Sequence, residues 1–162
     1  MGTCGLALLL LVLGDFFSTF LYHVPEHVFG KYHMKVHHSP NRSFIHYAVL
    51  SSNARVLVDG LLGAAPYILV AGLIGVYDLT AALIGILLGQ VHVWWRHTSI
   101  LKWETPRPLQ TLCSYCWIVT PEIHWLHHQN INLAYGDIFT FYDKPAQMWL
   151  SYLRKVYFKR LA

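Results

Sequence analysis

The sequence has little charge. Only 12% of its 162 residues are Asp, Glu, Lys or Arg, whereas 55% are hydrophobic, and its mean hydropathy is +0.39. A soluble domain is usually about 25% charged. We therefore expect an integral membrane protein, and the length indicates a single domain over residues 1–162.

Cysteine and nucleotide-binding motifs are also scarce. Three cysteines build no disulfide framework, and the CSYC spacing of Cys113 and Cys116 lacks the second pair or thioredoxin-like context of a zinc or redox site, so we interpret it as helix packing. No basic run indicates nucleic-acid binding. There is no flavin or NAD fingerprint and no four-cysteine iron–sulfur pattern, so redox chemistry would need an external electron donor.

Long apolar segments are present instead. Residues 4–22, 56–76 and 79–95 are each close to the length of about 20 residues that crosses a bilayer. The second and third segments are separated only by Tyr77 and Asp78, which predicts a helical hairpin that crosses the membrane and returns.

Two further segments are shorter or more polar. Residues 111–120 are apolar over about half a span, which predicts a partly embedded helix. Residues 145–161 mix aromatic and basic side chains, as an interfacial amphipathic helix does. The predicted fold is all-α: a multi-pass membrane helical bundle of about three to four spans, with a histidine-rich cap and a C-terminal amphipathic helix.

The basic residues give the bundle an orientation. All 12 Lys and Arg residues fall on one side of the three-span topology, and the positive-inside rule makes that side cytoplasmic. The histidines fall on the same side. We expect a multi-pass protein of a bacterial inner membrane or the endoplasmic reticulum, with its histidines on the cytoplasmic side.

Histidine is abundant, with 11 residues. Ten of them form four groups, HVPEH, HMKVHH, HVWWRH and HWLHH, while His46 stands alone. Several are spaced i, i+3 or i+4, on one helical face, and each group lies at or near the end of an apolar segment. Neutral imidazole suits iron, zinc and copper. Ten histidines exceed the four ligands of a structural zinc and suit two metals.

The chemistry that these groups predict is oxidative. Two adjacent metals with few protein carboxylates favour oxygen chemistry over hydrolysis. His92 lies inside a membrane segment, where an ionisable residue is a functional candidate. The acids near the groups are candidate acceptors that orient the imidazoles; they are Asp15, Glu26, Glu122 and Asp137.

The order of these motifs resembles the fatty acid hydroxylase/sterol desaturase superfamily, which are integral membrane non-haem di-iron oxygenases. The resemblance rests on HxxxH, HxxxHHS, an intramembrane His followed by RHTS, and TPEIHWLHH with AYGDIFTFYD, and covers residues 15–143. Met34 stands where the second box usually has histidine, and Tyr142-Asp143 replaces a Trp-Asp pair. The resemblance implies ten ligands for two iron ions: His23, His27, His33, His37, His38, His92, His97, His124, His127 and His128.

The same resemblance implies a function. The expected reaction is O₂-dependent hydroxylation of a C–H bond in a fatty acyl, sterol or related lipid, with electrons from cytochrome b5, a ferredoxin or a similar reductase chain. Zinc can replace iron in a purified protein of this kind. Desaturation and carotenoid hydroxylation are alternatives on the same site. A non-catalytic membrane protein that binds metal or haem is the alternative of another class. Oligomeric state is left open.

Overall fold

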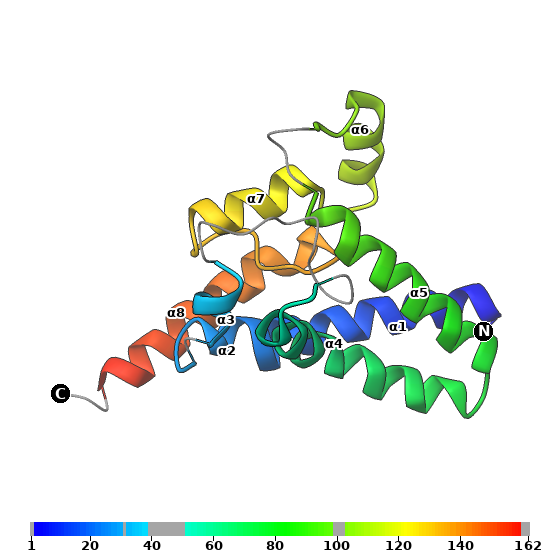
Figure 1. Cartoon of the computed structure of the whole chain (residues 1–162), viewed down its shortest axis with the longest axis horizontal. Coiled ribbons are helices and arrows are strands. Elements are labelled where there is room, and N and C mark those ends of the chain that lie inside the picture. Colours follow the sequence, from blue (N-terminus) through cyan, green and yellow to red (C-terminus); the bar gives the residue numbers. More distant parts are fainter. Residues whose placement is uncertain (1, 31, 39–50, 99–102, 160–162) are drawn as a thin grey trace.

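The computed structural model describes residues 2–30, 32–38, 51–98 and 103–159 (Figure 1). Within these ranges every regular element is a helix, apart from an isolated antiparallel bridge between Ile118 and Phe139. Three helices are long and apolar enough to cross a membrane. The prediction of an all-α bundle is confirmed, and the predicted three to four spans correspond to three candidate spans among the described residues.

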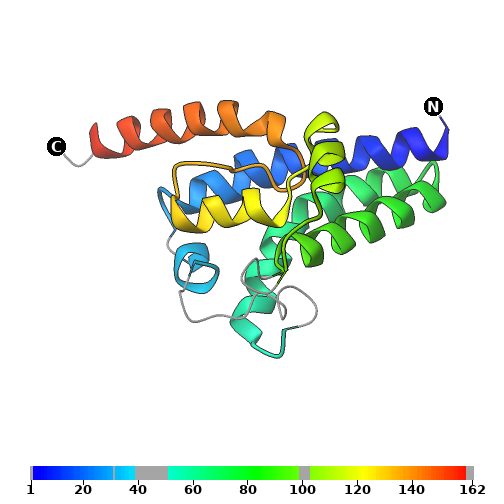
Figure 2. The ribbon, with the colours of Figure 1, turned by 90° about the horizontal axis from the view of Figure 1, so that it is seen from above.

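The three long helices lie side by side in both ribbon views (Figures 1 and 2). The first combines α1 (Thr3–Phe17), a π-helical segment η1 (Ser18–His23) and the short α2 (Val24–Glu26). The second and third are α4 (Ala54–Gly75) and α5 (Leu79–Arg96). They therefore provide one apolar platform with two ends.

Asp78 lies at one end of this platform, in the turn between α4 and α5. Its carboxylate accepts a hydrogen bond from the backbone N–H of Ala81, which caps α5, and another from the hydroxyl of Thr3 at 2.7 Å. The predicted hairpin is thus present, and its turn lies beside the start of the first helix.

Leucines cover the outer faces of α4 and α5 while smaller side chains face inward. Leu69 and Leu73 are 72% and 71% exposed, as in a helix that packs against lipid. Inside, Gly14 lies so close to the ring of Tyr67 that an added Cβ would be 2.2 Å from it. Such small residues allow membrane helices to approach closely. The buried contacts between the three helices include Leu10, Leu11, Tyr67, Val70, Ile74, Ala81 and Ala82.

The first helix is not regular where its histidine motif begins. Residues 18–23 form a π-helix, immediately before Pro25. Proline has no N–H to donate to the carbonyl of Leu21 four residues earlier, so the preceding turn is free to widen. The sequence predicted an uninterrupted helix over 4–22. The widened turn changes the direction in which His23 leaves the helix.

Shorter helices cover the other end of the platform. They are α3 (Tyr32–Val36), α6 (Arg107–Tyr115), α7 (Pro121–Gln129), the 3₁₀ turn η4 (Thr140–Tyr142) and α8 (Asp143–Lys159). Helix α8 is amphipathic, as predicted for 145–161. It buries Ala146, Leu150 and Leu153, and the indole N–H of Trp149 donates to the carbonyl of Phe20.

Helix α6 differs from the predicted helix over 111–120, because it begins at Arg107 and ends at Tyr115. Pro108 suits the first helical turn, where no N–H partner is needed. Trp117 has a φ of 53°, which ends the helix, and Ile118 then pairs with Phe139. The apolar residues after Trp117 therefore hold a loop instead of extending a helix.

Gly136 offers a test of the loop between α7 and η4. A Cβ at this position would lie 2.1 Å from the carbonyl oxygen of Phe139. We expect Gly136→Ala to destabilise the fold by about 1–3 kcal/mol, since the backbone must move to relieve the overlap. Thermal unfolding in detergent would show a lower Tm. Gly72→Ala is the matched control, because no heavy atom lies within 4 Å of its added Cβ; equal Tm values for the two variants would contradict the expectation.

Candidate metal centre

Nine of the ten candidate histidines converge at one end of the bundle, where α2, α3 and α7 meet (Figure 1). They form two groups, within each of which the ligand atoms lie within 4.8 Å of one another. The five-histidine group comprises His23, His27, His33, His38 and His127. The four-histidine group comprises His37, His97, His124 and His128.

The two groups share two helices. Helix α7 delivers His127 to the five-histidine group, and His124 and His128, one turn apart, to the four-histidine group. At α3, His33 and His37 likewise belong to different groups. Because the same short helices build both groups, the two sites must be adjacent.

Nitrogen distances in the five-histidine group have the dimensions of a coordination shell. The Nε2 atom of His127 lies 3.0 Å from Nε2 of His23 and 3.2 Å from Nε2 of His27. With metal–nitrogen bonds of about 2.1 Å, neighbouring ligands are about 3.0 Å apart in an octahedron and about 3.4 Å apart in a tetrahedron. The spacing therefore fits imidazoles around one metal ion.

The four-histidine group has the same dimensions. The Nε2 atom of His124 lies 3.1 Å from Nε2 of His97, 3.1 Å from that of His128 and 3.4 Å from that of His37. The Nε2 atoms of His97 and His37 are 3.4 Å apart. This group therefore fits a second ion.

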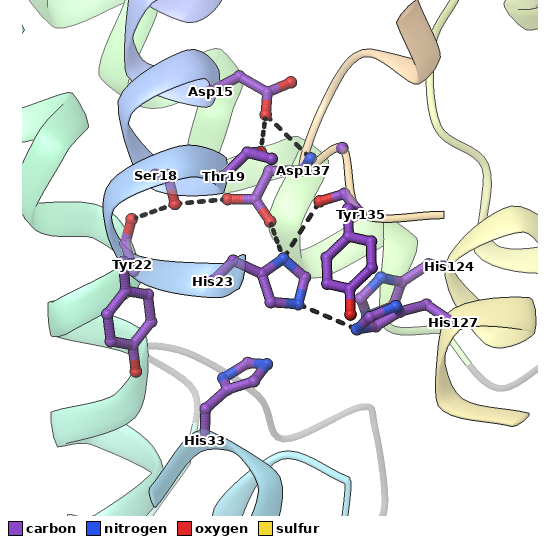
Figure 3. Close-up of polar contacts among 12 residues, drawn as sticks. Asp15, Ser18, Thr19, Tyr22, His23, His33, His124, His127, Tyr135 and Asp137 are labelled. Atoms are coloured by element: carbon purple, nitrogen blue, oxygen red, sulfur yellow. Dashed lines mark hydrogen bonds and ion pairs between the residues drawn. The ribbon is translucent and has the colours of Figure 1, made fainter. Parts of the chain in front are cut away.

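Backbone carbonyls set the direction of three of these rings. In each case a carbonyl oxygen accepts the Nδ1 proton, so the ring presents the lone pair of Nε2 to its group. The acceptors are Tyr135 for His23 at 3.1 Å, Val93 for His97 at 2.6 Å and Leu133 for His127 at 2.6 Å. Figure 3 shows His23 held in this way, with His127 facing its Nε2 atom.

Other ring nitrogens have no such acceptor. Among the described residues, the buried Nε2 of His33 and both ring nitrogens of His38 have no hydrogen-bond partner. Lone pairs that face one another repel, and buried polar atoms without partners are costly. A cation in the five-histidine group would bind Nε2 of His33 and one ring nitrogen of His38, and a cation in either group would attract the facing lone pairs, so the donor set fits two metal ions.

The protonation state of the rings also suits metal binding. Burial, together with the neighbouring imidazoles, lowers the pKa of His27, His38 and His128 to about 2. Burial lowers the pKa of His127 to about 4. These rings are therefore neutral near pH 7, which is the form that binds a metal.

Asp15 reaches the site through the backbone. Its fully buried carboxylate accepts hydrogen bonds from the N–H groups of Asp137, Ile138 and Phe139, at 2.7–2.9 Å, and from the hydroxyl of Thr19 (Figure 3). The predicted role was to orient an imidazole. The contacts show that Asp15 holds the loop that carries Asp137.

Asp137 lies directly beside a histidine. Its Oδ1 atom is 2.9 Å from Nη1 of Arg96 and 3.8 Å from Nδ1 of His23. Its Oδ2 atom is 2.7 Å from the hydroxyl of Ser18, whose single proton is shared with the carbonyl of Gly63. Asp137 thus joins α5, the π-helical turn and the five-histidine group.

The two predicted glutamates contact backbone. Glu26 accepts a hydrogen bond from the N–H of His33 at 3.3 Å, and so positions the start of α3. Glu122 accepts from the N–H of Thr105 at 2.7 Å, which ties the segment before α6 to α7. Within the part of the chain that the structure describes, neither carboxylate pairs with an imidazole ring.

His92 lies outside both groups. Its Nε2 atom donates to the carbonyl of Val119 at 2.9 Å, and its ring packs edge-on against Trp95. The structure therefore places His92 against the loop after α6. His46 lies outside the described residues.

Asp59 was missed by the sequence analysis although it contacts two candidate ligands. It lies in the second turn of α4 and is 3% exposed. Its Oδ1 atom is 3.1 Å from Nδ1 of His33, and its Oδ2 atom is 3.7 Å from Nδ1 of His37. An acid inside an otherwise apolar span was the available signal.

Comparison with known proteins agrees with the site. The family model described as "Fatty acid hydroxylase" matches residues 7–147, which include all nine grouped histidines. Neither the curated proteins nor the solved structures give a match.

Metal content separates grouped histidines from His92. We expect His97→Ala to lower metal affinity at the four-histidine group by at least about 10–100-fold, because a direct ligand is lost. His92→Ala should retain wild-type metal content, since only the contact with Val119 is lost. Elemental analysis of the two purified variants measures the metal content of each, which should be lower in His97→Ala. A His92→Ala protein that folds but loses one ion would contradict the placement of His92.

Acid should destabilise the metal-free protein. The unfolded chain titrates its histidines near pH 6.5, whereas the folded pKa values of His27, His38 and His128 are about 2. Below pH 6.5 the unfolded state therefore binds more protons, and each ring removes about 1.4 kcal/mol of stability per pH unit until its folded pKa is reached. Stability is fully present above about pH 7.

Thermal unfolding of the metal-free protein across this pH range measures the effect. A double variant, His27→Gln with His128→Gln, is the control and should show a shallower decline. A wild-type Tm that does not change between pH 5 and pH 6.5 would contradict the expectation.

Proposed function

The chain belongs to the fatty acid hydroxylase family, and on that premise we propose that it is an O₂-dependent di-iron oxidoreductase that hydroxylates a C–H bond of a lipid. The observation that carries the proposal is the pair of adjacent histidine groups at the end of an apolar three-helix bundle. Two iron ions, when bound, supply the activation of O₂ for attack on an unactivated C–H bond.

The residues around the groups hold and orient the ligands. Imidazoles on or directly after η1, α2, α3, α5 and α7 form the two sites, and the carbonyls of Leu133, Tyr135 and Val93 fix three of the rings. Asp137 lies beside His23 and is itself held by Arg96, so it supports the position of that ring. Most of the grouped rings are buried, which excludes water from the reaction.

The bundle determines which substrates can approach. Its outer surface carries exposed leucines along α4 and α5 up to the level of the histidine groups, so a substrate dissolved in the bilayer is favoured over a water-soluble one. We assign the substrate to the fatty acyl, sterol or related lipids. Electrons come from an external donor such as cytochrome b5, a ferredoxin or a similar reductase chain.

The proposal also includes a location. The histidine groups and the basic residues lie on the same side in the predicted topology, which by the positive-inside rule is the cytoplasmic side of a bacterial inner membrane or the endoplasmic reticulum. A soluble donor would reach the metal centre from that side.

Lipid profiling tests the function. Expression in a host should produce a lipid that has gained one oxygen atom, whereas desaturation would remove two hydrogen atoms. The variant His127→Ala with His128→Ala removes one ligand from each group, and should lower product formation at least about 100-fold. Gly72→Ala is the control for expression.

Full activity of the double histidine variant would exclude the proposed mechanism. A haem absorption band in the purified wild-type protein would instead favour a haem-binding membrane protein.

A further inference from the structure

Asp59 is a buried acid with no part in the function proposed above. It lies in α4, inside a candidate membrane span, and is 3% exposed. A carboxylate in such a place needs partners that stabilise its charge. Its contacts therefore indicate what it does.

Three donors surround this carboxylate. Its Oδ1 atom accepts a hydrogen bond from the hydroxyl of Tyr22 at 2.8 Å and lies 3.1 Å from Nδ1 of His33. Its Oδ2 atom lies 3.7 Å from Nδ1 of His37. One carboxylate thus faces one ligand of the five-histidine group and one ligand of the four-histidine group.

The packing of His33 and His37 makes this possible. Their rings are stacked with centroids 4.5 Å apart and planes 17° apart, and the N–H of His37 donates to the carbonyl of His33. Both Nδ1 edges therefore point to the same side, toward α4.

The opposite edges point to the metal groups. The Nε2 atom of His37 is 3.4 Å from the Nε2 atoms of both His97 and His124. The buried Nε2 atom of His33 has no hydrogen-bond partner among the described residues. A proton on Nδ1 of each ring leaves Nε2 as the ligand.

We propose that Asp59 is a positioning residue that couples the two metal sites. It accepts the Nδ1 proton of His33 and attracts that of His37, and so turns each Nε2 atom toward its own group. The neighbouring rings of His23, His97 and His127 are oriented by neutral carbonyls. Unlike a neutral carbonyl, the charged carboxylate of Asp59 also makes its two imidazoles stronger ligands.

The two distances predict an unequal effect. A separation of 3.1 Å is a hydrogen bond, whereas 3.7 Å is an electrostatic contact. Loss of the charge should therefore weaken the five-histidine group more than the four-histidine group. The inference depends on the metal centre of the proposed function but on no step of turnover.

Cobalt titration of the metal-free protein tests the proposal. Asp59→Asn keeps the shape of the side chain and removes its charge. We expect Co²⁺ affinity to fall about 10–100-fold in the His97→Ala background, which leaves the five-histidine group intact. A smaller loss is expected in the His27→Ala background, which leaves the four-histidine group intact. Gly72→Ala is the control, because it also alters α4 but its added Cβ meets no heavy atom within 4 Å, and it should bind Co²⁺ as the wild type does.

Two outcomes would overturn the proposal: unchanged Co²⁺ affinity in Asp59→Asn, or an equal loss in Gly72→Ala, which would show that the effect does not depend on the carboxylate. If Asp59→Asn does not fold, ¹⁵N-histidine NMR of the zinc-bound wild type decides, with His33 assigned by comparison with His33→Gln. A protonated Nδ1 and a zinc-bound Nε2 support the proposal, and zinc on Nδ1 contradicts it. Because neither measurement involves a lipid, absence of lipid oxidation would leave the inference standing.

Discussion

The structure depends on the hydrogen bonds between the carboxylate of Asp15 and the backbone of residues 137–139. Asp15 is fully buried in the first membrane helix, where an unpaired charge would be very unfavourable. Three backbone N–H groups satisfy it at 2.7–2.9 Å. These bonds dock the loop after α7 onto α1, and that loop supplies the carbonyls of Leu133 and Tyr135 and the carboxylate of Asp137. Asp15 therefore acts on the metal centre at a distance, by holding the segment that orients its ligands.

The ligands themselves impose a second condition on the fold. Neutral imidazoles that point their lone pairs at one another repel, so the polypeptide must hold them together from outside. It does so with rigid acceptors at the Nδ1 edges: carbonyls for His23, His97 and His127, and the carboxylate of Asp59 for His33. Each acceptor belongs to a helix or to the loop held by Asp15. The protein itself thus sets the direction of these four rings before a metal ion binds.

Much of this could be predicted from the sequence. The apolar segments predicted the three spans, because a helix that crosses a bilayer must be apolar over a fixed length. Spacings of three and four residues predicted that the histidines of α7 share one face. The second-turn acid of α4 was overlooked, although an acid in a membrane segment is itself a signal. The displaced α6 was harder to predict, since the chain after it turns at Trp117 and Ile118 then pairs with Phe139, which is distant in the sequence.

His92 shows where motif and geometry separate. It is five residues from His97, and five residues turn an α-helix by about 140° beyond one full turn, so the two rings leave α5 in different directions. His97 shares a face with Val93, whose carbonyl holds its ring. His92 shares a face with Arg96, and both side chains contact loops: Val119 for His92 and Asp137 for Arg96. One face of α5 therefore supplies a ligand while the adjacent face fastens the segments that enclose the metal centre. The chain therefore has more histidines than helical phase brings into the two groups of described residues.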